Sequence, residues 1–350
     1  MKVLYHFPHY NTTIYAYRTI VNGFMHAFME MGHEFKVYTS DDNLKEQLSN
    51  FNPDIFLTQS HHFYQRYLDL NLLKRYRDNG MVMFTKIDFW NNTISVKRVN
   101  EAKNLKDDKE TIRLIKKGLL GDYFYHVVEQ NDPRMDGFER ETGQKFFTIP
   151  LAADKTVLLK SKYVDKYKSD ISFIGTNLPE KRQYFGEYVF PLGKKYKLKL
   201  YGQDWTEKDK ILGWVQRGGQ YFNIPFIRSA QKPKLSLEDE GNIYASSSVS
   251  INVHEDYQRK FGGDCNERTF KIPMAGGFEI TDDVLCIRKY FKDGEEIIIA
   301  KDKKDWFEKI DYYIKNPKKR EEIIRKGKER VLREHTYNNR VALILKIAGK

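Results

Sequence analysis

The sequence has few cysteines and lacks the long apolar runs of membrane-spanning proteins. It contains only two cysteines, Cys265 and Cys286, too few for a disulfide framework in 350 residues and without metal-ligand spacing. No stretch approaches the roughly 18 apolar residues that span a bilayer. The amino-terminal apolar run is interrupted by His6, Pro8 and His9, unlike a signal peptide. We therefore expect a cytoplasmic protein with two reduced thiols.

Basic residues are in excess. The 60 Lys and Arg outnumber the 48 Asp and Glu, so the formal net charge is +12, which favours anionic partners. In Lys318–Arg330 the basic residues alternate with acids on a helical pattern. This pattern favours a solvated helix face, and attraction to an anionic lipid surface or a lipid-linked substrate is the alternative. Peripheral association with the inner membrane surface is therefore left open.

Length and pattern predict two α/β domains. The chain exceeds the roughly 100–200 residues of one domain, and 40% of its residues are hydrophobic. Strand-like runs alternate with helical ones, as in parallel sheets. In the first half we expect strands at residues 3–7, 34–38, 54–58, 81–87, 123–128 and 145–149, and helices at 14–31, 44–49, 67–79 and 96–120.

A second α/β domain is predicted after a basic, weakly periodic stretch, residues 151–169, which we interpret as a linker. Its expected strands are 170–174, 197–201, 249–253, 277–280 and 296–299, and its expected helices are 180–190, 305–315, 318–335 and 338–347. We assign residues 1–160, with the C-terminal helix 338–350, to the N-terminal domain. The C-terminal domain is predicted to span residues 168–337.

Polar side chains follow several predicted strands of the first domain. His6 and His9 come after the first strand, His61-His62 after the third and Asp88 after the fourth. Ligands of open parallel sheets bind at the carboxyl ends of the strands, and His9, His62 and Asp88 are candidates for a general base. Each has a simpler explanation, since His9 could shape the first helix, His62 could lie on a solvated loop, and Asp88 could cap a strand end.

A glycine turn follows the first strand of the second domain. Gly175-Thr176 leads into a predicted helix that carries Lys181 and Arg182. Backbone N–H groups and a helix N-terminus at such a junction can hold a phosphate. A glycine at a strand end most often only allows the chain to turn. This motif alone therefore does not predict a phosphate site, and a second feature is needed.

That feature is the stretch Asn266–Asp282, which reads Asn-Glu-Arg-Thr-Phe-Lys-Ile-Pro-Met-Ala-Gly-Gly-Phe-Glu-Ile-Thr-Asp. It resembles the donor-binding region of the group 1 glycosyltransferases of the GT-B superfamily, closest to the CgeB-like branch. The pattern there is roughly Arg-x-Phe-Glu-x-Pro-Ala-x-Gly, followed by a strand ending in Asp. The segments Asp170–Thr176, Leu200–Gly202 and His335–Arg340 extend the resemblance to about residues 168–345.

The resemblance implies a GT-B fold, in which two Rossmann-like domains face across a cleft and the C-terminal helix crosses back to the N-terminal domain. It implies a glycosyltransferase that moves a sugar from a nucleotide diphosphate-sugar to a glycan, glycoconjugate or lipid-linked acceptor. The N-terminal domain would bind the acceptor and the C-terminal domain the donor. Such enzymes usually need neither metal nor cofactor, and the absence of an Asp-x-Asp sequence agrees.

The donor diphosphate carries two negative charges, so it needs fixed hydrogen-bond donors and one or two cations. Arg268 is the best candidate cation. Gly276-Gly277 would let the backbone turn into the next strand, although a purely structural C-cap would look the same; His254 could likewise be a satisfied polar group. The expected donor-binding residues are Gly175, Thr176, Arg182, Tyr201, Gly202, His254, Arg268, Lys271, Gly276 and Gly277.

One position departs from the family pattern. Lys271 stands where relatives usually have a Glu that is implied to hold the ribose hydroxyls. A lysine cannot accept those hydrogen bonds. Either Lys271 contacts phosphate instead, or another carboxylate such as Glu279 or Asp282 holds the ribose.

Two other functions fit parts of the pattern. A nucleotide-sugar epimerase would share the fold and the phosphate site. A non-enzymatic protein that binds nucleic acid or a membrane surface would explain the positive charge. No nucleic-acid-binding module is recognisable, and the basic residues alternate with acids, so we expect no nucleic-acid partner.

Overall fold

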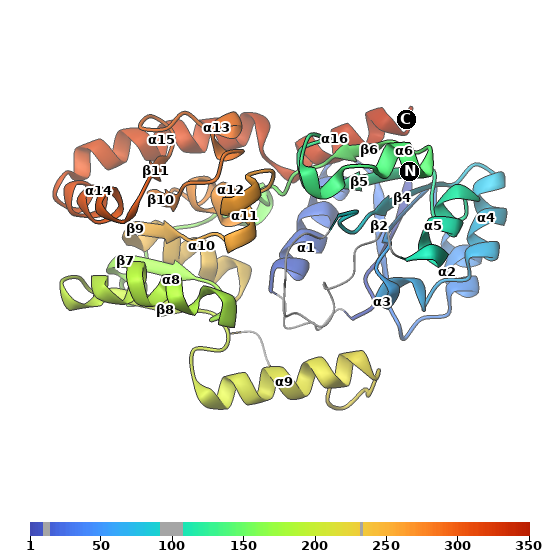
Figure 1. The fold of residues 1–350 in the computed structure, drawn as a ribbon, viewed down its shortest axis with the longest axis horizontal. Helices are drawn as coiled ribbons and strands as arrows, with labels where there is room; N and C mark the ends of the chain where they lie inside the picture. Colours follow the sequence, from blue (N-terminus) through green and yellow to red (C-terminus); the bar gives the residue numbers. More distant parts are fainter. Residues whose placement is uncertain (10–14, 92–107, 232–233) are drawn as a thin grey trace. The chain divides into compact units, whose positions relative to one another are not determined.

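The computed structural model describes residues 1–9, 15–91, 108–231 and 234–350. The chain forms two compact α/β units (Figure 1). Unit 1 consists of Met1–Tyr10, Phe24–Pro150 and Arg340–Lys350, and unit 2 of Asn11–Gly23 and Leu151–Asn339. The last residues thus return to unit 1, as expected for a GT-B C-terminal helix.

Unit 1 contains, in its described part, a six-stranded parallel sheet of order β2-β1-β3-β4-β5-β6. Its strands are β1 (Lys2–His6), β2 (Glu34–Tyr38), β3 (Ile55–Gln59), β4 (Val82–Lys86), β5 (Tyr123–His126) and β6 (Phe146–Thr148). Val3, Leu4 and Phe56 are fully buried. Burial of neighbouring residues that point to opposite faces means that both faces of the sheet are covered.

The helices of this half are α1 (Tyr15–Glu30, shared between the units), α2 (Leu44–Phe51), α3 (His62–Gln65), α4 (Leu70–Asp78), α5 (Lys109–Lys116), α6 (Phe138–Thr142) and α16 (Tyr337–Ile347). Asn43, Asp69 and Asp108 begin α2, α4 and α5, because each side chain accepts a hydrogen bond from a first-turn N–H group. The predicted helix 96–120 lies partly outside the described residues.

Unit 2 contains, in its described part, a five-stranded parallel sheet of order β11-β10-β9-β7-β8. The strands are β7 (Ser169–Ile174), β8 (Leu198–Tyr201), β9 (Ser247–Asn252), β10 (Glu279–Asp282) and β11 (Ile298–Ala300). The helices are α7 (Lys155–Leu158), α8 (Arg182–Tyr184), α9 (Glu207–Tyr221), α10 (Leu237–Ser246), α11 (Asp256–Phe261), α12 (Arg268–Met274), α13 (Ile287–Tyr290), α14 (Lys303–Lys315) and α15 (Pro317–Glu334). One apolar cluster surrounds Trp306 and another surrounds Phe270.

One expectation about this half is wrong. Residues 151–169 are not a free linker, because Ala153 and Leu158 are buried in the core of unit 2. The chain is helical over the stretch expected at 180–190, but the helix changes type, from the 3-10 turn Pro179–Lys181 through α8 to a π-helical segment at Phe185–Val189. Pro179 and Pro191 lie in the first turns of the flanking 3-10 segments, where a proline costs no internal hydrogen bond.

Among the described helices, none combines the length and the apolar character that crossing a bilayer requires.

Candidate functional site

Two glycines, Gly175 after β7 and Gly202 after β8, lie in backbone contact at the carboxyl edge of the unit 2 sheet. The N–H of Gly175, just after β7, donates to the carbonyl of Tyr201 at 2.9 Å. Gly202 has φ +117°, and a Cβ built on it would lie 2.3 Å from the Gly175 oxygen. The Trp205 indole donates to that same oxygen at 2.9 Å. Only glycine fits at position 202, and the turns after β7 and β8 hold each other in place.

Two cationic side chains converge at the end of β9. Arg268 Nη2 donates to the carbonyl of Val253 at 2.9 Å, and Lys181 Nζ donates to it at 3.3 Å. The Arg268 guanidinium lies over the Phe173 ring, 5.4 Å from its centroid. Its Nη1 faces the β7 turn, since a Cβ built on Gly175 would be 3.4 Å away. Within the described part of the chain, no carboxylate forms a salt bridge with Arg268.

Asn252, the last residue of β9, fixes the direction of Arg268. Its Oδ1 accepts from Arg268 Nε at 3.0 Å and from Asn266 Nδ2 at 2.8 Å. Its Nδ2 donates to Glu279 Oε1 at 2.8 Å. Asn252 and Glu279 are both buried, and burial raises the pKa of Glu279 to about 8. A buried amide with both ends bonded cannot rotate freely, so Arg268 is held by a rigid partner.

His254 lies in a closed network of hydrogen bonds. Its Nδ1 is 2.6 Å from Asp282 Oδ1, and Arg259 Nη1 donates to the other oxygen of Asp282 at 2.8 Å. Burial lowers the pKa of His254 despite the neighbouring carboxylate. Burial by itself would raise the pKa of Asp282, but His254 and Arg259 outweigh it and the pKa is lowered. The imidazole and the carboxylate are thus used to join the ends of β9 and β10.

Lys271 is buried between two carboxylates. Its Nζ lies 2.9 Å from both Glu240 Oε1 and Glu267 Oε1. The other oxygen of Glu267 accepts from Thr19 Oγ1 at 2.8 Å. Burial by itself would lower the pKa of Lys271, but the two carboxylates outweigh this and the pKa is raised. The ammonium group is therefore charged and already neutralised, which is poor chemistry for a phosphate ligand.

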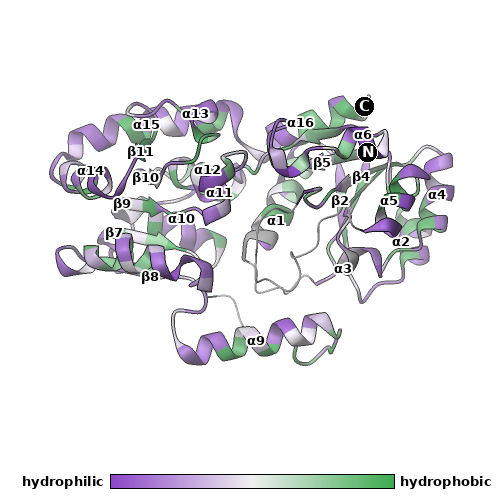
Figure 2. Ribbon diagram, in the orientation of Figure 1, coloured by the Kyte–Doolittle hydropathy of each residue, from purple (hydrophilic) through white to green (hydrophobic). Residues whose placement is uncertain are grey.

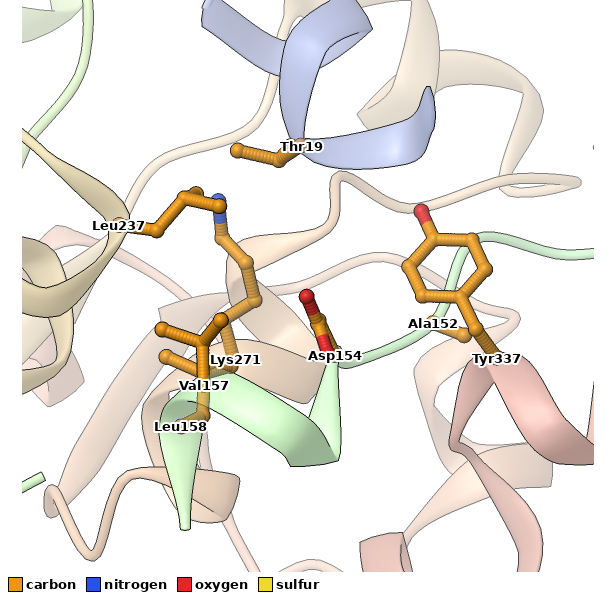
Figure 3. A pocket seen from close by; sticks show the side chains of 8 residues that line it. All are labelled: Thr19, Ala152, Asp154, Val157, Leu158, Leu237, Lys271 and Tyr337. Carbon is orange, nitrogen blue, oxygen red and sulfur yellow. The ribbon is translucent and has the colours of Figure 1, made fainter. Parts of the chain in front are cut away.

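Figure 3 shows a pocket of unit 2 into which Lys271 projects, with its ammonium end near Thr19. The other lining residues are Ala152, Asp154, Val157, Leu158, Leu237 and Tyr337. The space has room for about one water molecule. It is therefore too small for a nucleotide sugar.

Three further expected donor residues lie elsewhere. Arg182 is exposed, and its charge acts on Glu207, whereas the preceding Lys181 is buried at the carboxyl edge. Gly276 and Gly277 form the C-cap of α12, where the N–H of Gly277 donates to Ile272. They precede β10, and because the strands are parallel, they lie at the opposite edge of the sheet from Arg268. Thr176 follows Gly175 in the β7 turn.

In unit 1, the carboxyl ends of β1, β3 and β4 are neighbours. His6 Nδ1 lies 2.9 Å from Thr58 Oγ1, and burial, with a contribution from His9, lowers the pKa of His6 to about 3. His9 is buried, with Nδ1 3.4 Å from Ser40 Oγ.

Asp88 is half-buried, and its N–H donates to Ser60 Oγ at 2.9 Å. His62 begins α3, and its side chain lies outside the description. The loops expected to form a site in unit 1 thus occupy one edge of its sheet. No group of three or more His, Cys, Asp or Glu suited to a metal ion occurs among the described residues of either unit.

The chain matches one protein family by sequence and several solved structures by fold. Residues 182–346 match a family described as glycosyl transferase-like. No curated protein sequence matches significantly. The structure of an alpha-glucosyltransferase in complex with UDP and a 13-mer DNA is 12% identical, with a TM-score of 0.67 and 100% of both chains covered.

Two further structures extend the comparison. Sucrose-phosphate synthase from Thermosynechococcus elongatus is 10% identical, with a TM-score of 0.63 and 99% and 98% of the two chains covered. A putative UDP-N-acetylglucosamine 2-epimerase from Listeria monocytogenes is 11% identical, with a TM-score of 0.52 and 99% and 94% covered. At sequence identities this low, the similarity shows a shared fold and nothing more.

Proposed function

Since residues 182–346 match the glycosyl transferase-like family and the chain has the GT-B fold, we propose that this protein transfers a sugar from a nucleotide diphosphate-sugar to a hydroxyl of a glycan, glycoconjugate or lipid-linked acceptor. The observation that carries the proposal is the convergence of Lys181 and Arg268 beside the Gly175 turn. A structurally similar alpha-glucosyltransferase binds UDP, which makes UDP-sugars the first donors to test.

In this proposal the donor diphosphate occupies the space in front of Gly175 and Thr176. Arg268 Nη1 faces that turn, and Lys181 adds a second positive charge within reach of the same carbonyl. As transfer proceeds, the bond between the sugar C1 and the diphosphate oxygen breaks, and its electron pair stays with the nucleoside diphosphate. Fixed cations stabilise the charge that develops there. This chemistry needs no metal ion.

The acceptor would bind at the carboxyl edge of the unit 1 sheet. Its hydroxyl oxygen forms the new bond to C1, and an inverting reaction passes the hydroxyl proton to a base. With a pKa of about 3, His6 is too weak a base near neutral pH. His9, His62 and Asp88 remain the candidates, and Asp88 has a hydrogen-bonded main chain that fixes its position.

Lys271 receives a positioning role in place of a ligand role. It pairs with Glu240 of α10 and with Glu267, the residue before α12, and so ties the start of α12 to α10. Arg268 directly follows Glu267, so these pairs hold the helix turn that carries Arg268, while Asn252 fixes the direction of the guanidinium.

The test uses purified protein, a panel of nucleotide sugars and their nucleoside diphosphates. Thermal shift and calorimetry identify the donor, and mass spectrometry follows its conversion with and without glycan or lipid-linked acceptors. We expect binding of one nucleotide class and release of nucleoside diphosphate that depends on acceptor. Isomerisation of the donor without any acceptor would mean that the protein is an epimerase.

A further inference from the structure

Helix α9 buries polar side chains and exposes apolar ones, the opposite of the usual arrangement in a surface helix. In a surface helix the apolar stripe faces the core and the polar side faces water. Here the polar residues Asp209, Gln216 and Gln220 are buried, and the apolar residues are exposed. Figure 1 shows α9 standing away from the sheet of its own unit, and in Figure 2 hydrophobic residues recur along it.

The inner face of α9 is held by polar contacts. The Gln231 side chain donates to Asp204 Oδ1 at 3.0 Å and to the Asp209 carbonyl at 2.8 Å. The N–H of Gln231 donates to Gln216 Oε1 at 2.6 Å. Buried hydrogen bonds of this kind fix which side of a helix faces inward. The exposure of the apolar side is therefore built into the fold.

The outer face of α9 exposes a set of apolar residues, here called the apolar ridge. Ile211, Trp214 and Val215 recur at three- and four-residue spacing, and Tyr221 and Phe222 follow two turns later on the same side. The ridge continues from α9 into the following turn. Its members and their exposed fractions are Ile211 65%, Trp214 77%, Val215 40%, Tyr221 45%, Phe222 71% and Phe226 83%. Soluble proteins rarely leave several large apolar side chains of one helix face uncovered.

Basic residues border the ridge. At 100° per residue, Lys208 lies on one flank of the apolar stripe, and Lys210 and Arg217 lie on the other. Long basic side chains beside an aromatic stripe can reach lipid headgroups while the rings enter the interface. Lys210 is paired with Glu207, and Arg217 lies 3.8 Å from Asp204, so Lys208 is the flanking cation without a salt bridge in the described part of the chain.

From the aromatic ridge and its basic borders we propose that α9 docks this protein onto an anionic membrane surface. The rings of Trp214, Phe222 and Phe226 enter the headgroup region, and the flanking basic residues contact anionic headgroups. A protruding ridge fits a fluid lipid interface, whereas a preformed protein partner would need a complementary groove. Docking does not depend on the transfer reaction; if that reaction is as proposed, docking would bring the enzyme to lipid-linked acceptors.

Flotation of the full chain with vesicles tests the proposal. We expect binding to phosphatidylcholine vesicles that contain phosphatidylglycerol, and far less to phosphatidylcholine alone or at high salt. The double variant Trp214→Ser/Phe222→Ser should bind at least about tenfold more weakly, because each ring loses its apolar burial. Circular dichroism and thermal unfolding should be unchanged, since both side chains are exposed.

Tryptophan fluorescence provides a second measurement. Trp214 is the exposed one of the four tryptophans, whereas Trp90 and Trp306 are fully buried and Trp205 is half-buried. A blue shift on adding anionic vesicles, absent in Trp214→Phe, supports insertion. Leu285→Ser, at another exposed apolar side chain of unit 2, is the matched control and should bind like wild type.

Equal flotation of the double variant and wild type would overturn the proposal. So would failure of the wild type to bind anionic vesicles, and self-association that the double variant abolishes would then identify the ridge as a contact between copies. Donor binding, measured separately, is unaffected by either result. Failure of docking is thus distinguishable from failure of the proposed function.

Discussion

Lys181 and Arg268 donate hydrogen bonds to a single main-chain oxygen, that of Val253, at 3.3 and 2.9 Å. One cation comes from the turn after β7 and the other from the first turn of α12. Their convergence places two positive charges at the carboxyl edge of a parallel sheet, where ligands of such sheets bind. A main-chain carbonyl carries no net charge, so this contact aligns the two side chains without removing the positive charge of Arg268.

Removing either cation should weaken donor binding. We expect Arg268→Ala and Lys181→Ala each to raise the Kd for the nucleoside diphosphate about 10- to 100-fold, because each loses a charge-assisted hydrogen bond of about 1.5–3 kcal/mol. Calorimetry measures this directly. Arg182→Ala, next in sequence to Lys181 but exposed, is the control and should leave the Kd within about twofold. A larger effect at Arg182 than at Lys181 would reject the proposed site.

The contact between Gly175 and Gly202 should make position 202 intolerant of any side chain. Gly202→Ala places a Cβ 2.3 Å from a main-chain oxygen at φ +117°. We expect a loss of at least about 2 kcal/mol in the free energy of unfolding. Urea titration provides the measurement, and Gly218→Ala in α9, where the Cβ meets nothing within 4 Å, is the control. That variant should be neutral or slightly stabilised.

Lys271 should matter for stability more than for ligand charge. Lys271→Met leaves Glu240 and Glu267 buried without their cation, and we expect a loss of about 3–5 kcal/mol. Lys271→Glu, which restores the usual family residue, should be worse because three carboxylates would share the site. Exchanging the charges, with Glu240→Lys added, should recover part of the stability. A Lys271→Met variant as stable as wild type would contradict this prediction.

Glu279 should make stability fall as pH rises. Its pKa is about 8 when folded and 4.5 ordinarily, because burial outweighs the hydrogen bond from Asn252 and the charge of Arg268, with Asp282 adding to the rise. The folded state therefore holds the proton more tightly, and this contribution is complete below pH 4.5 and lost by about pH 8. Glu279→Gln keeps the neutral form and the acceptor oxygen for Asn252.

We expect Glu279→Gln to match wild type near pH 4.5 and to exceed it at pH 9 by roughly 2–5 kcal/mol. Chemical unfolding at the two pH values is the measurement. Wild type and variant share every other titrating group, so the difference between their free energies of unfolding reports on Glu279. A difference that does not change with pH would mean that Glu279 is ionised throughout.

The sequence by itself determined the fold class. Short apolar strands that alternate with helices and end in glycine or polar residues are typical of parallel sheets. The Asn266–Asp282 stretch carries the resemblance to the glycosyltransferase donor domain because its residues are consecutive, so their order can be read without knowledge of the fold. Arg268 was named on that basis and lies at the expected edge of its sheet.

Only the tertiary structure decided which side chains meet. Lys181 and Arg182 are neighbours in sequence, but the irregular turns at Pro179–Val189 have no steady period from which to tell which faces inward. The partners of Lys271 come from α10 and from the residue before α12, and no spacing predicts a pair 31 residues apart. Which side of α9 faces inward was also decided by the tertiary structure, because the helix buries glutamines and exposes aromatics. Burial and pairing depend on segments distant in sequence, which a local pattern does not contain.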